Sequence, residues 1–418
     1  MRIKVDENGN WRSFRHRNFR ILYPANAMSN IGTWAQRVAQ DWLVLELTDN
    51  NGFYLGLVTA IQFAPVLLFS LQGGAMADRI DKRKLLIWTN IVAALACYAL
   101  GILVVTEVIQ LWHVFVCAAV LGISSALDAP IRQSFTAEIV GHSDVANAVS
   151  LNSANFNAGR LVGPALSGFL IARFDTGPSF LINATTYLFV IASLFFMRSS
   201  DFFIQKKEET LGTIREGLRY AKARPDLYVV MALVFFAATF GLNFQIFNAL
   251  MASKEFGKGP AEFGLLGTYI AVGSLTGALL SARLERFRDA KFVMRLGVWF
   301  SIVVIVLSVM PTYTWYSLWL PVCGISALTM LISANSYVQV NSDPAVRGRV
   351  MGIYLLVFMG GTPVGSLLIG YLTEALGTRE TIALCGGFSL LMCVLIWVFF
   401  NDKVERPADL RVSSVLGK

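Results

Sequence analysis

Charged residues are scarce in this sequence. Only 15% of its 418 residues are Asp, Glu, Lys or Arg, whereas 55% are hydrophobic, and the mean hydropathy is +0.58. A soluble domain carries about 25% charged residues, so this chain has too few to cover a surface that faces water. Segments such as 88–105 and 383–400 supply about the 20 apolar residues that a helix needs to cross a bilayer. The composition excludes a soluble globular protein and predicts an all-α membrane protein.

Residues for metal binding, nucleotide binding and covalent catalysis are sparse or absent. The three histidines, His16, His113 and His142, are scattered, and the five cysteines all lie in apolar segments without a Cys-x-x-Cys pair. Such patterns favour neither a metal site nor a disulfide framework. The sequence also has no G-x-x-x-x-G-K-[ST], no H-E-x-x-H and no nucleophile elbow. We therefore expect no metal, no cofactor and no enzymatic activity.

Lysine and arginine outnumber the acidic residues, 35 to 27, which gives a net charge of +8. Most of these cations fall in alternate connections and in the two termini, whereas the other connections hold only Arg173, Lys254, Lys258 and Arg379. This alternation is the positive-inside pattern of membrane proteins. It predicts an even number of crossings with both termini in the cytoplasm. It also attributes the positive charge to topology and lipid headgroups rather than to nucleic acid.

Apolar runs separated by turn signals predict twelve transmembrane helices. The longest connection divides them into a six-helix bundle at 1–198, a cytoplasmic linker at 199–226, and a second six-helix bundle at 227–418 that ends in a cytoplasmic tail. The expected helices lie at 19–47, 53–76, 86–106, 111–132, 146–172, 178–198, 227–251, 262–284, 292–311, 315–339, 348–373 and 381–401.

The linker itself has a helical pattern. Leu211, Ile214, Leu218 and Ala221 recur at helical spacing, with basic residues beside them. This pattern indicates a basic amphipathic helix at the membrane surface. The alternative is a solvated tether between the bundles.

The two predicted bundles repeat each other weakly. The segment 74–84 after the second helix has a degraded counterpart at 281–291 after the eighth, and Gly163-Pro164 in the fifth helix has a counterpart in Thr362-Pro363 of the eleventh. A duplicated six-helix unit is typical of secondary transporters. We therefore expect two pseudo-symmetric bundles in a monomer, and not a channel built from several subunits.

The first predicted helix carries charges at membrane depth. Such a charge costs at least ~2.5–3.5 kcal/mol on insertion scales, so it should face the protein interior or water. Arg37 and Asp41 lie one turn apart, which places them on one face. Asp41 is either a carboxylate that can carry a proton or half of a buried ion pair that fixes helix packing. The polar stripe to which both belong comprises Asn26, Asn30, Thr33, Arg37, Gln40 and Asp41.

Two further helices of the first bundle carry charges. Asp128 and Arg132 repeat the one-turn spacing in the fourth helix, and Arg160 lies in the fifth. Because an unpaired arginine would be costly there, we expect Arg160 to pair with Asp41 or Asp128, or else to reach helix-end carbonyls. The candidates for proton coupling are Asp41, Asp128, Arg37 and Arg160.

Amides and aromatic residues on several helices are candidates for a substrate cavity. For the amides, hydrogen bonding between helices explains the pattern as well as substrate contact does. The candidates are Asn30, Trp34, Gln40, Asn155, Asn243, Phe244, Phe247, Asn248, Asn335 and Gln339. In the fifth helix, Gly159, Gly163, Pro164 and Gly168 predict close helix packing with a kink at the proline.

Several motifs together resemble the major facilitator superfamily. Gly74-x-x-x-Asp78-Arg79-x-x-Lys82-Arg83 resembles its loop signature between helices two and three, although Asp81 stands where that signature usually has glycine. Gly159-x-x-x-Gly163-Pro164 resembles the fifth-helix signature of its drug:proton antiporters. The stretches 30–42 and 130–160 are similar to the branch that contains the bacterial enterobactin exporter and macrolide or multidrug efflux proteins.

The resemblance implies a twelve-helix exporter in a bacterial plasma (inner) membrane that exchanges a small amphiphilic compound for protons by alternating access. It also implies that the loop is a conformational latch, in which Asp78 caps the amino end of the eleventh helix. Alternatives on the same fold are a solute importer and a lysolipid translocator. A membrane-embedded enzyme is disfavoured because the sequence has no nucleophile–base or metal pattern.

Overall fold

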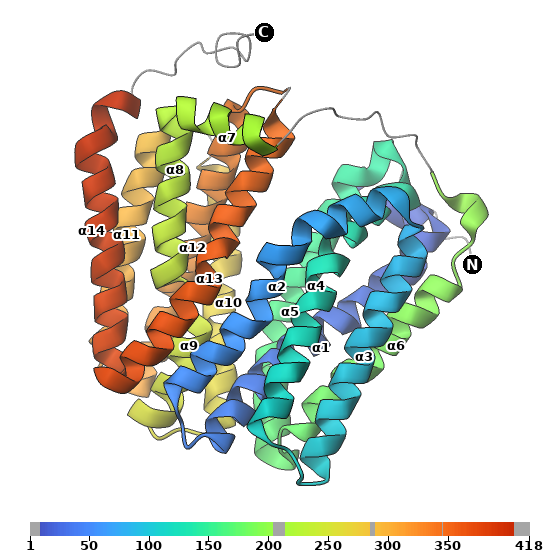
Figure 1. Cartoon of the computed structure of the whole chain (residues 1–418), viewed down its shortest axis with the longest axis horizontal. Helices are drawn as coiled ribbons and strands as arrows, with labels where there is room; N and C mark the ends of the chain where they lie inside the picture. Colours follow the sequence, from blue (N-terminus) through green and yellow to red (C-terminus); the bar gives the residue numbers. More distant parts are fainter. Residues whose placement is uncertain (1–8, 204–213, 285–288, 345, 405–418) are drawn as a thin grey trace. The chain divides into compact units, whose positions relative to one another are not determined.

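The computed structural model describes residues 9–203, 214–284, 289–344 and 346–404; within these ranges the side chains of 70–79, 214–215, 282 and 402–403 are not described. Every regular element in these ranges is a helix (Figure 1). The α-helices are α1 (Arg17–Leu47), α2 (Gly52–Arg79), α3 (Lys82–Val105), α4 (Leu111–Val140), α5 (Val145–Phe174), α6 (Gly177–Phe195), α7 (Ile214–Ala223), α8 (Pro225–Phe236), α9 (Phe244–Leu250), α10 (Pro260–Arg283), α11 (Ala290–Ser308), α12 (Tyr313–Asn341), α13 (Arg347–Ala375) and α14 (Thr378–Val404).

Ten helical segments of the described chain are long and apolar enough to cross a membrane. Among the long helices, α1 and α5 are not in this set. These two helices carry Arg37, Asp41 and Arg160 together with several amides, which lower their hydropathy. The all-helical prediction is confirmed, while the count of twelve crossings stays a prediction.

The chain divides into two compact units. Unit 1 comprises residues 1–50, 61–208 and 258–268, and unit 2 comprises residues 51–60, 209–257 and 269–418. The first turns of α2 therefore belong to unit 2, and the first turns of α10 belong to unit 1. Close packing accounts for both assignments: Gly56 of α2 lies against the backbone of Ser366 in α13, and Gly264 of α10 lies against the Pro164 carbonyl in α5.

In unit 1, α1 packs against α5 and α6, while α3 packs against α4 and α6 (Figure 1). A buried apolar cluster joins these helices near one end of the unit, with Phe19, Leu86, Phe135 and Leu194 among its members. Polar side chains interrupt the apolar packing farther along α1, α4 and α5, and this interruption positions the site described below.

In unit 2, α11 packs against α12 and α14, and α13 packs against α7 and α8. The interior is rich in aromatic contacts. Phe240 lies 4.6 Å from Phe388 between ring centroids, and Phe244 lies 6.3 Å from Phe300. Apolar ring packing of this kind fills space without leaving polar groups to satisfy.

The segment expected to form a helix at 227–251 lies in one candidate membrane span, Pro225–Glu255, but its α-helix is interrupted, which the sequence did not predict. α8 is followed by a π-helical turn at Ala237–Gly241, and α9 starts only after Leu242 and Asn243. The Asn243 side chain donates to the Thr239 carbonyl at 2.8 Å, which satisfies a backbone group at the break. The sequence marks this position only by Gly241, without a proline.

Helix α7 lies in the predicted linker and crosses the ends of α8 and α13 (Figure 1). Tyr220 and Ala221 are buried against unit 2, whereas Leu218 of the expected apolar stripe is 43% exposed. The other two members of that stripe, Leu211 and the side chain of Ile214, lie outside the described residues. The buried face of α7 is thus turned toward protein, and Leu218 is left on its outer face.

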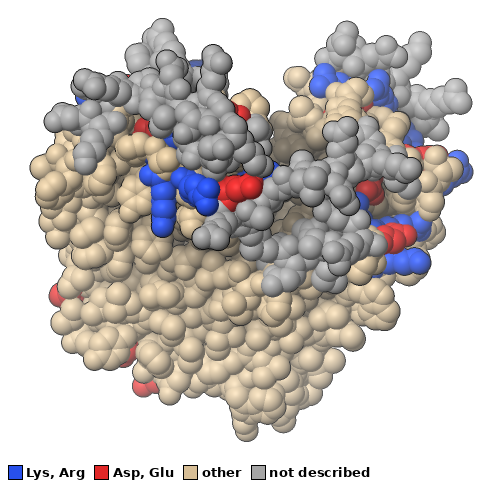
Figure 2. All heavy atoms as spheres, turned by 45° about the horizontal axis from the view of Figure 1, so that its top comes forward, with Lys and Arg blue, Asp and Glu red and all other residues tan. Residues whose placement is uncertain are grey.

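Lysine and arginine side chains gather near the end of the helices at which α7 lies, and the flanks below that end are almost free of charge (Figure 2). Apolar side chains of the candidate membrane spans, such as Leu95, Leu279 and Val398, are more than half exposed. An apolar flank with charges at its ends fits a protein that is surrounded by lipid.

Candidate functional site

A polar cavity of about 550 Å³ lies within unit 1. Its lining combines side chains of five helices and is mainly made of amides and hydroxyls, with one carboxylate and one guanidinium. The lining residues are Asn26, Ser29, Asn30 and Thr33 of α1; Thr89, Asn90 and Ala93 of α3; Ser124, Ser125, Asp128, Ala129, Arg132, Gln133 and Thr136 of α4; Val149, Asn152, Ser153, Phe156 and Asn157 of α5; and Tyr187 of α6.

An ion pair between Asp128 and Arg132 forms the charged part of this lining. Arg132 donates through Nε to Asp128 Oδ2 at 2.7 Å and through Nη2 to Oδ1 at 2.9 Å, so the pair is bidentate. Thr89 and Asn90 of α3 each donate to Asp128 Oδ1 at 3.1 Å. The remaining Arg132 nitrogen, Nη1, donates to Asn26 of α1. The ion pair therefore ties together three helices, because Asp128 contacts α3 and Arg132 contacts α1.

Arg160 does not pair with Asp41 or Asp128, so the predicted partner is wrong. Asp128 already binds Arg132, which lies one turn away on the same helix. Among the described residues, no carboxylate lies within ion-pair distance of Arg160 or Arg37. Both guanidiniums lie over the ring of Trp34 instead, with Cζ 5.8 Å from its centroid for Arg160 and 4.9 Å for Arg37.

Asp41 lies away from the cavity lining. It is 2% exposed, compared with 20% for the Asp128 side chain. Its neighbour Gln40 belongs to a chain of buried amides, in which Gln36 donates to Gln40 at 3.1 Å and Gln40 donates to Gln62 of α2 at 3.2 Å. The polar stripe of α1 therefore splits, because Asn26, Asn30 and Thr33 face the cavity, while Gln40 and Asp41 are buried between helices.

Of the predicted cavity residues, Asn30 lines the cavity directly. Trp34 lies beside it, with its ring 5.6 Å from that of the lining residue Phe156. Asn155, which lies on the same helix as Phe156, is 5% exposed and donates to the Tyr23 carbonyl at 3.3 Å. Asn155 thus connects α5 to α1. In a similar way, the chain of buried amides that contains Gln40 connects α1 to α2.

The predicted cavity residues of unit 2 are not part of this cavity. Asn248 accepts a hydrogen bond from Tyr316 at 3.0 Å, and Phe244 and Phe247 are buried and lie 6.5 Å apart. Asn243 bonds within its own helix break, as described above. On α12, Asn335 is half-buried and Gln339 is exposed. For Asn243 and Asn248 the structure favours a packing role.

Several lining residues lay outside the candidate set from the sequence. Thr89 and Asn90 are polar residues of α3, and Tyr187 is one of several polar residues of α6. Polar side chains within these membrane-spanning helices are the available sequence signal, because an amide at membrane depth needs a partner. Arg132 was noted for its spacing from Asp128, but its role in tying α4 to α1 depends on tertiary packing.

The predicted latch loop falls partly outside the described residues. Nothing is described of the side chains at Gly74, Asp78 and Arg79. Lys82 binds Glu138 of α4 at 2.6 Å, and Arg83 donates to the Phe195 carbonyl at 3.0 Å.

The departure from the family's loop signature has a local explanation. Asp81 accepts from the backbone N–H of Lys84 at 3.2 Å and so caps the amino end of α3. A glycine at this position could not provide that side-chain acceptor.

The glycines of the predicted packing motif lie at close helix contacts. A Cβ on Gly159 would be 2.8 Å from the Asn30 carbonyl carbon, and a Cβ on Gly163 would be 2.6 Å from Trp34 Cβ. A Cβ on Gly168 would be 2.7 Å from the carbonyl oxygen of Pro260. These contacts hold α5 against α1 and against the first turn of α10, and Pro164 lies inside α5.

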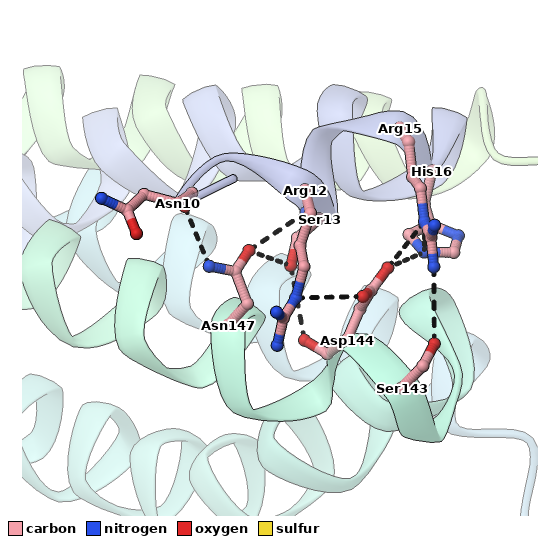
Figure 3. Close-up of polar contacts among 8 residues, drawn as sticks. All are labelled: Asn10, Arg12, Ser13, Arg15, His16, Ser143, Asp144 and Asn147. Atoms are coloured by element: carbon pink, nitrogen blue, oxygen red, sulfur yellow. Dashed lines mark hydrogen bonds and ion pairs between the residues drawn. The ribbon is translucent and has the colours of Figure 1, made fainter. Parts of the chain in front are cut away.

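A second charged cluster of unit 1 fixes the chain before α1 (Figure 3). Asp144, directly before α5, is 2% exposed and binds Arg12, Arg15 and His16 at 3.3, 2.8 and 2.7 Å. Asn147 accepts from the Ser13 hydroxyl at 2.7 Å in the same cluster. The cluster lies at the ends of helices and has no member in the cavity lining.

Known proteins resemble this chain over nearly its whole length. It is 23% identical over 401 residues to the staphyloferrin A transporter of Staphylococcus aureus, covering 93% of this chain and 98% of that one. It is 23% identical to the enterobactin exporter EntS of Shigella boydii, covering 94% and 93%. Among solved structures, a bacterial homologue of the human lysosomal transporter Spinster superposes with a TM-score of 0.77 at 14% identity, covering 94% and 98%.

These similarities and the matching family model indicate the same superfamily as the sequence motifs. The family model described as "Transmembrane secretion effector", within the major facilitator superfamily, matches residues 8–415. The resemblance to the branch of enterobactin exporters and efflux proteins is therefore confirmed. The chain belongs to this family of the major facilitator superfamily and is a membrane transporter, not an enzyme.

Proposed function

We propose that the protein is a secondary active exporter that moves a small amphiphilic compound out of the cell in exchange for protons. Its relatives include transporters named for the export of a siderophore and for multidrug efflux, which supports the direction. We further propose twelve crossings with α1 and α5 among them, both termini in the cytoplasm, and a monomer in a bacterial inner membrane. The alternation of lysine and arginine along the chain supports this topology.

The observation that carries the proposal is a carboxylate inside a polar cavity at membrane depth. A cavity of about 550 Å³ is large enough for a small molecule, and its many amides and hydroxyls can bind polar groups in several orientations. Intramembrane ionisable residues typically mark ion or proton pathways. Asp128 is the carboxylate of this lining, which makes it our first candidate for proton coupling.

Protonation of Asp128 would change the contacts between helices. The ionised carboxylate accepts hydrogen bonds from Arg132 and from two side chains of α3. A neutral carboxyl group binds a guanidinium less strongly and has one oxygen that donates. Protonated and ionised forms would therefore favour different packings of α3 against α4, and a ligand shifts an equilibrium only by its differential affinity for the two states.

Asp41 is the second candidate for coupling. It is buried and lies one turn from Arg37, so its charge would also affect the packing of α1. It does not line the cavity, so a proton would need another path to reach it. Substrate and proton could compete directly at Asp128, but only indirectly at Asp41.

Transport into vesicles tests the function. The purified protein is reconstituted in liposomes, a pH gradient of either sign is imposed, and uptake of labelled amphiphiles of negative, zero and positive charge is measured. We expect the amphiphile to accumulate in the vesicles when protons flow out of them. Asp128→Asn should lose this accumulation but keep the downhill exchange of the amphiphile. Accumulation in the same direction as the protons would identify an importer, and no response to pH would identify a facilitator.

The paired variant Asp41→Asn assigns the coupling residue. We expect Asp41→Asn to retain gradient-driven accumulation that Asp128→Asn has lost. The reverse result would assign the proton to Asp41. Accumulation by both variants at an unchanged pH optimum would contradict proton coupling through either carboxylate.

A further inference from the structure

The helix interiors of unit 1 hold more positive than negative charge. Away from the helix ends, the described part of this unit has three arginines, Arg37, Arg132 and Arg160, but only two aspartates, Asp41 and Asp128. The pair of Asp128 and Arg132 is complete in itself. Asp41 can offset at most one of the other two arginines, so at least one guanidinium has no counter-charge among the described side chains of the helix interiors.

Arg37 and Arg160 come from different helices and meet at one aromatic ring. Their Cζ atoms lie 4.9 and 5.8 Å from the centroid of Trp34, and Arg37 also lies 5.7 Å from the ring of Phe63 in α2. Because both Cζ atoms lie within 6 Å of the same ring centroid, the two positive charges are close enough to repel each other. Like charges are held together in the membrane interior only where something compensates for their repulsion.

The donors of both arginines remain available. Among the described residues, neither guanidinium has a hydrogen bond or an ion pair, and Arg37 Nε is buried without an acceptor. A guanidinium over an aromatic face keeps its N–H groups in its own plane, where they can bind a carboxylate in a bidentate manner. The ring contact therefore orients the two arginines without using their donors.

This pair of arginines adjoins the polar cavity. Arg37 lies one turn beyond the lining residue Thr33, and Arg160 lies one turn beyond the lining residue Phe156, whose ring contacts Trp34. A molecule in the cavity could thus direct one end toward both guanidiniums while its apolar part contacts the aromatic side chains. The other end would face the amides and hydroxyls of the lining.

We propose that Arg37 and Arg160 form an anion subsite beside the cavity, and that the transported compound carries a carboxylate or similar anionic oxygen group that binds between them. This proposal rests on the proposed transport function and names the chemical class of its substrate. Asp128 and Arg132, as a neutral pair, contribute the proton-dependent part of the lining. The subsite supplies the charge recognition.

A matched pair of probes tests the subsite by binding alone. The full-length protein in lipid nanodiscs is dialysed to equilibrium against radiolabelled 2-naphthoate or 2-naphthamide, which share one aromatic body and differ in charge, with empty nanodiscs as the blank. We expect the naphthoate to bind at least about tenfold more tightly than the naphthamide, a ratio that a single well-placed charge contact can supply. Equal binding, or tighter binding of the naphthamide, would overturn the proposal.

Variants locate the preference. Arg37→Gln and Arg160→Gln should each remove most of the preference for naphthoate and leave naphthamide binding unchanged. Arg173→Gln, which removes an exposed arginine of the same helix as Arg160, is the matched control and should keep the preference. Preference that persists in both Arg37→Gln and Arg160→Gln would show that the anion binds elsewhere.

Thermal unfolding separates a binding role from a structural one. Loss of one of two repelling charges should leave the melting temperature unchanged or raise it. Naphthoate should raise the melting temperature of the wild type and of Arg173→Gln, but not that of Arg37→Gln or Arg160→Gln. If the glutamine variants do not fold, Arg37→Lys and Arg160→Lys keep the charge and should weaken, but not abolish, the preference.

The outcome is distinct from that of the transport experiment. The binding measurement needs no gradient, so charge preference without proton-driven accumulation would refute the proposed function and keep the subsite. Proton-driven accumulation without charge preference would do the opposite.

Discussion

The two units differ in where they place charge. In unit 1, ionisable residues lie in the middle of α1, α4 and α5, next to a polar cavity. In the described part of unit 2, every charged residue lies in the first two turns or the last turn of a helix, or in a connection. The interior of unit 2 is filled by aromatic and aliphatic side chains instead.

This difference separates the residues that can respond to protons and substrate from those that support them. The buried ion pair of unit 2, between Arg224 and Asp226, lies under α7 at the end of the unit. It is bidentate, at 2.9 and 2.8 Å, and Tyr337 donates to the same carboxylate at 3.0 Å. Such a pair fixes a helix end, whereas the pair at Asp128 borders a space that a ligand can enter.

The largest effect that we expect from a charge in unit 2 is on stability. Asp226→Asn should lower the free energy of unfolding by about 3 kcal/mol or more, because Arg224 would be left buried without its counter-charge. Transport per folded molecule should stay within about twofold of the wild type. Thermal unfolding in detergent and vesicle transport measure the two quantities.

The matched variant in unit 1 is Asp144→Asn. Its partners Arg12 and Arg15 are 32% and 40% exposed, so solvent screens them and the loss should be smaller and should shrink further in high salt. Equal losses of unfolding free energy in Asp226→Asn and Asp144→Asn would show that the burial of the arginine partners does not set the strength of these two ion pairs.

The stability that Arg224 provides should not depend on pH in the usual range. Hydrogen bonds to Asp226 raise the pKa of Arg224 above its ordinary value. A group whose pKa is raised by folding contributes stability that is complete below the unfolded pKa and is lost only as the pH rises through the folded value. For an arginine that loss lies far above neutral pH, so the effect of Asp226→Asn should be the same at about pH 7 and pH 9.

The second prediction concerns the charge pair of unit 1. Arg132→Gln should lower gradient-driven transport at least about tenfold, which corresponds to ~1.4 kcal/mol of lost discrimination between the two protonation states. The double variant Asp128→Asn/Arg132→Gln should be more stable than Arg132→Gln alone, because it no longer leaves an unpaired charge at membrane depth. Vesicle transport and thermal unfolding of the four proteins in the cycle provide the measurement.

An arginine of unit 2 serves as the control for this cycle. Arg295 of α11 is exposed, and Arg295→Gln should change transport by less than about twofold. A loss in Arg295→Gln as large as that in Arg132→Gln would remove the distinction between the units.

Much of the fold could be predicted from the sequence, because hydropathy and charge alternation act over long segments. The one-turn spacing of Asp128 and Arg132 also indicated a local pair, since both residues lie on one helix. The contact of Arg160 with Trp34 could not be predicted, because it depends on how α5 packs against α1. The break after Gly241 was missed for a similar reason, since tertiary packing decides whether a glycine interrupts a helix.

The smallest effect that we expect comes from removing one hydroxyl in each unit. In unit 2, Tyr316 is completely buried and donates to Asn248. Tyr316→Phe leaves that amide oxygen without its donor. The substitution should therefore lower the free energy of unfolding by about 1 kcal/mol and leave substrate affinity unchanged. In unit 1, Tyr187 lines the cavity, and its hydroxyl lies 3.4 Å from the Thr33 hydroxyl, a long and weak contact. Tyr187→Phe should therefore cost less stability but change substrate affinity by about twofold to tenfold, because a hydroxyl in a binding site contributes about 0.5–1.5 kcal/mol. Thermal unfolding and equilibrium binding of both variants give the comparison. A change of affinity in Tyr316→Phe with none in Tyr187→Phe would place the ligand in unit 2 and reverse the assignment of the two units.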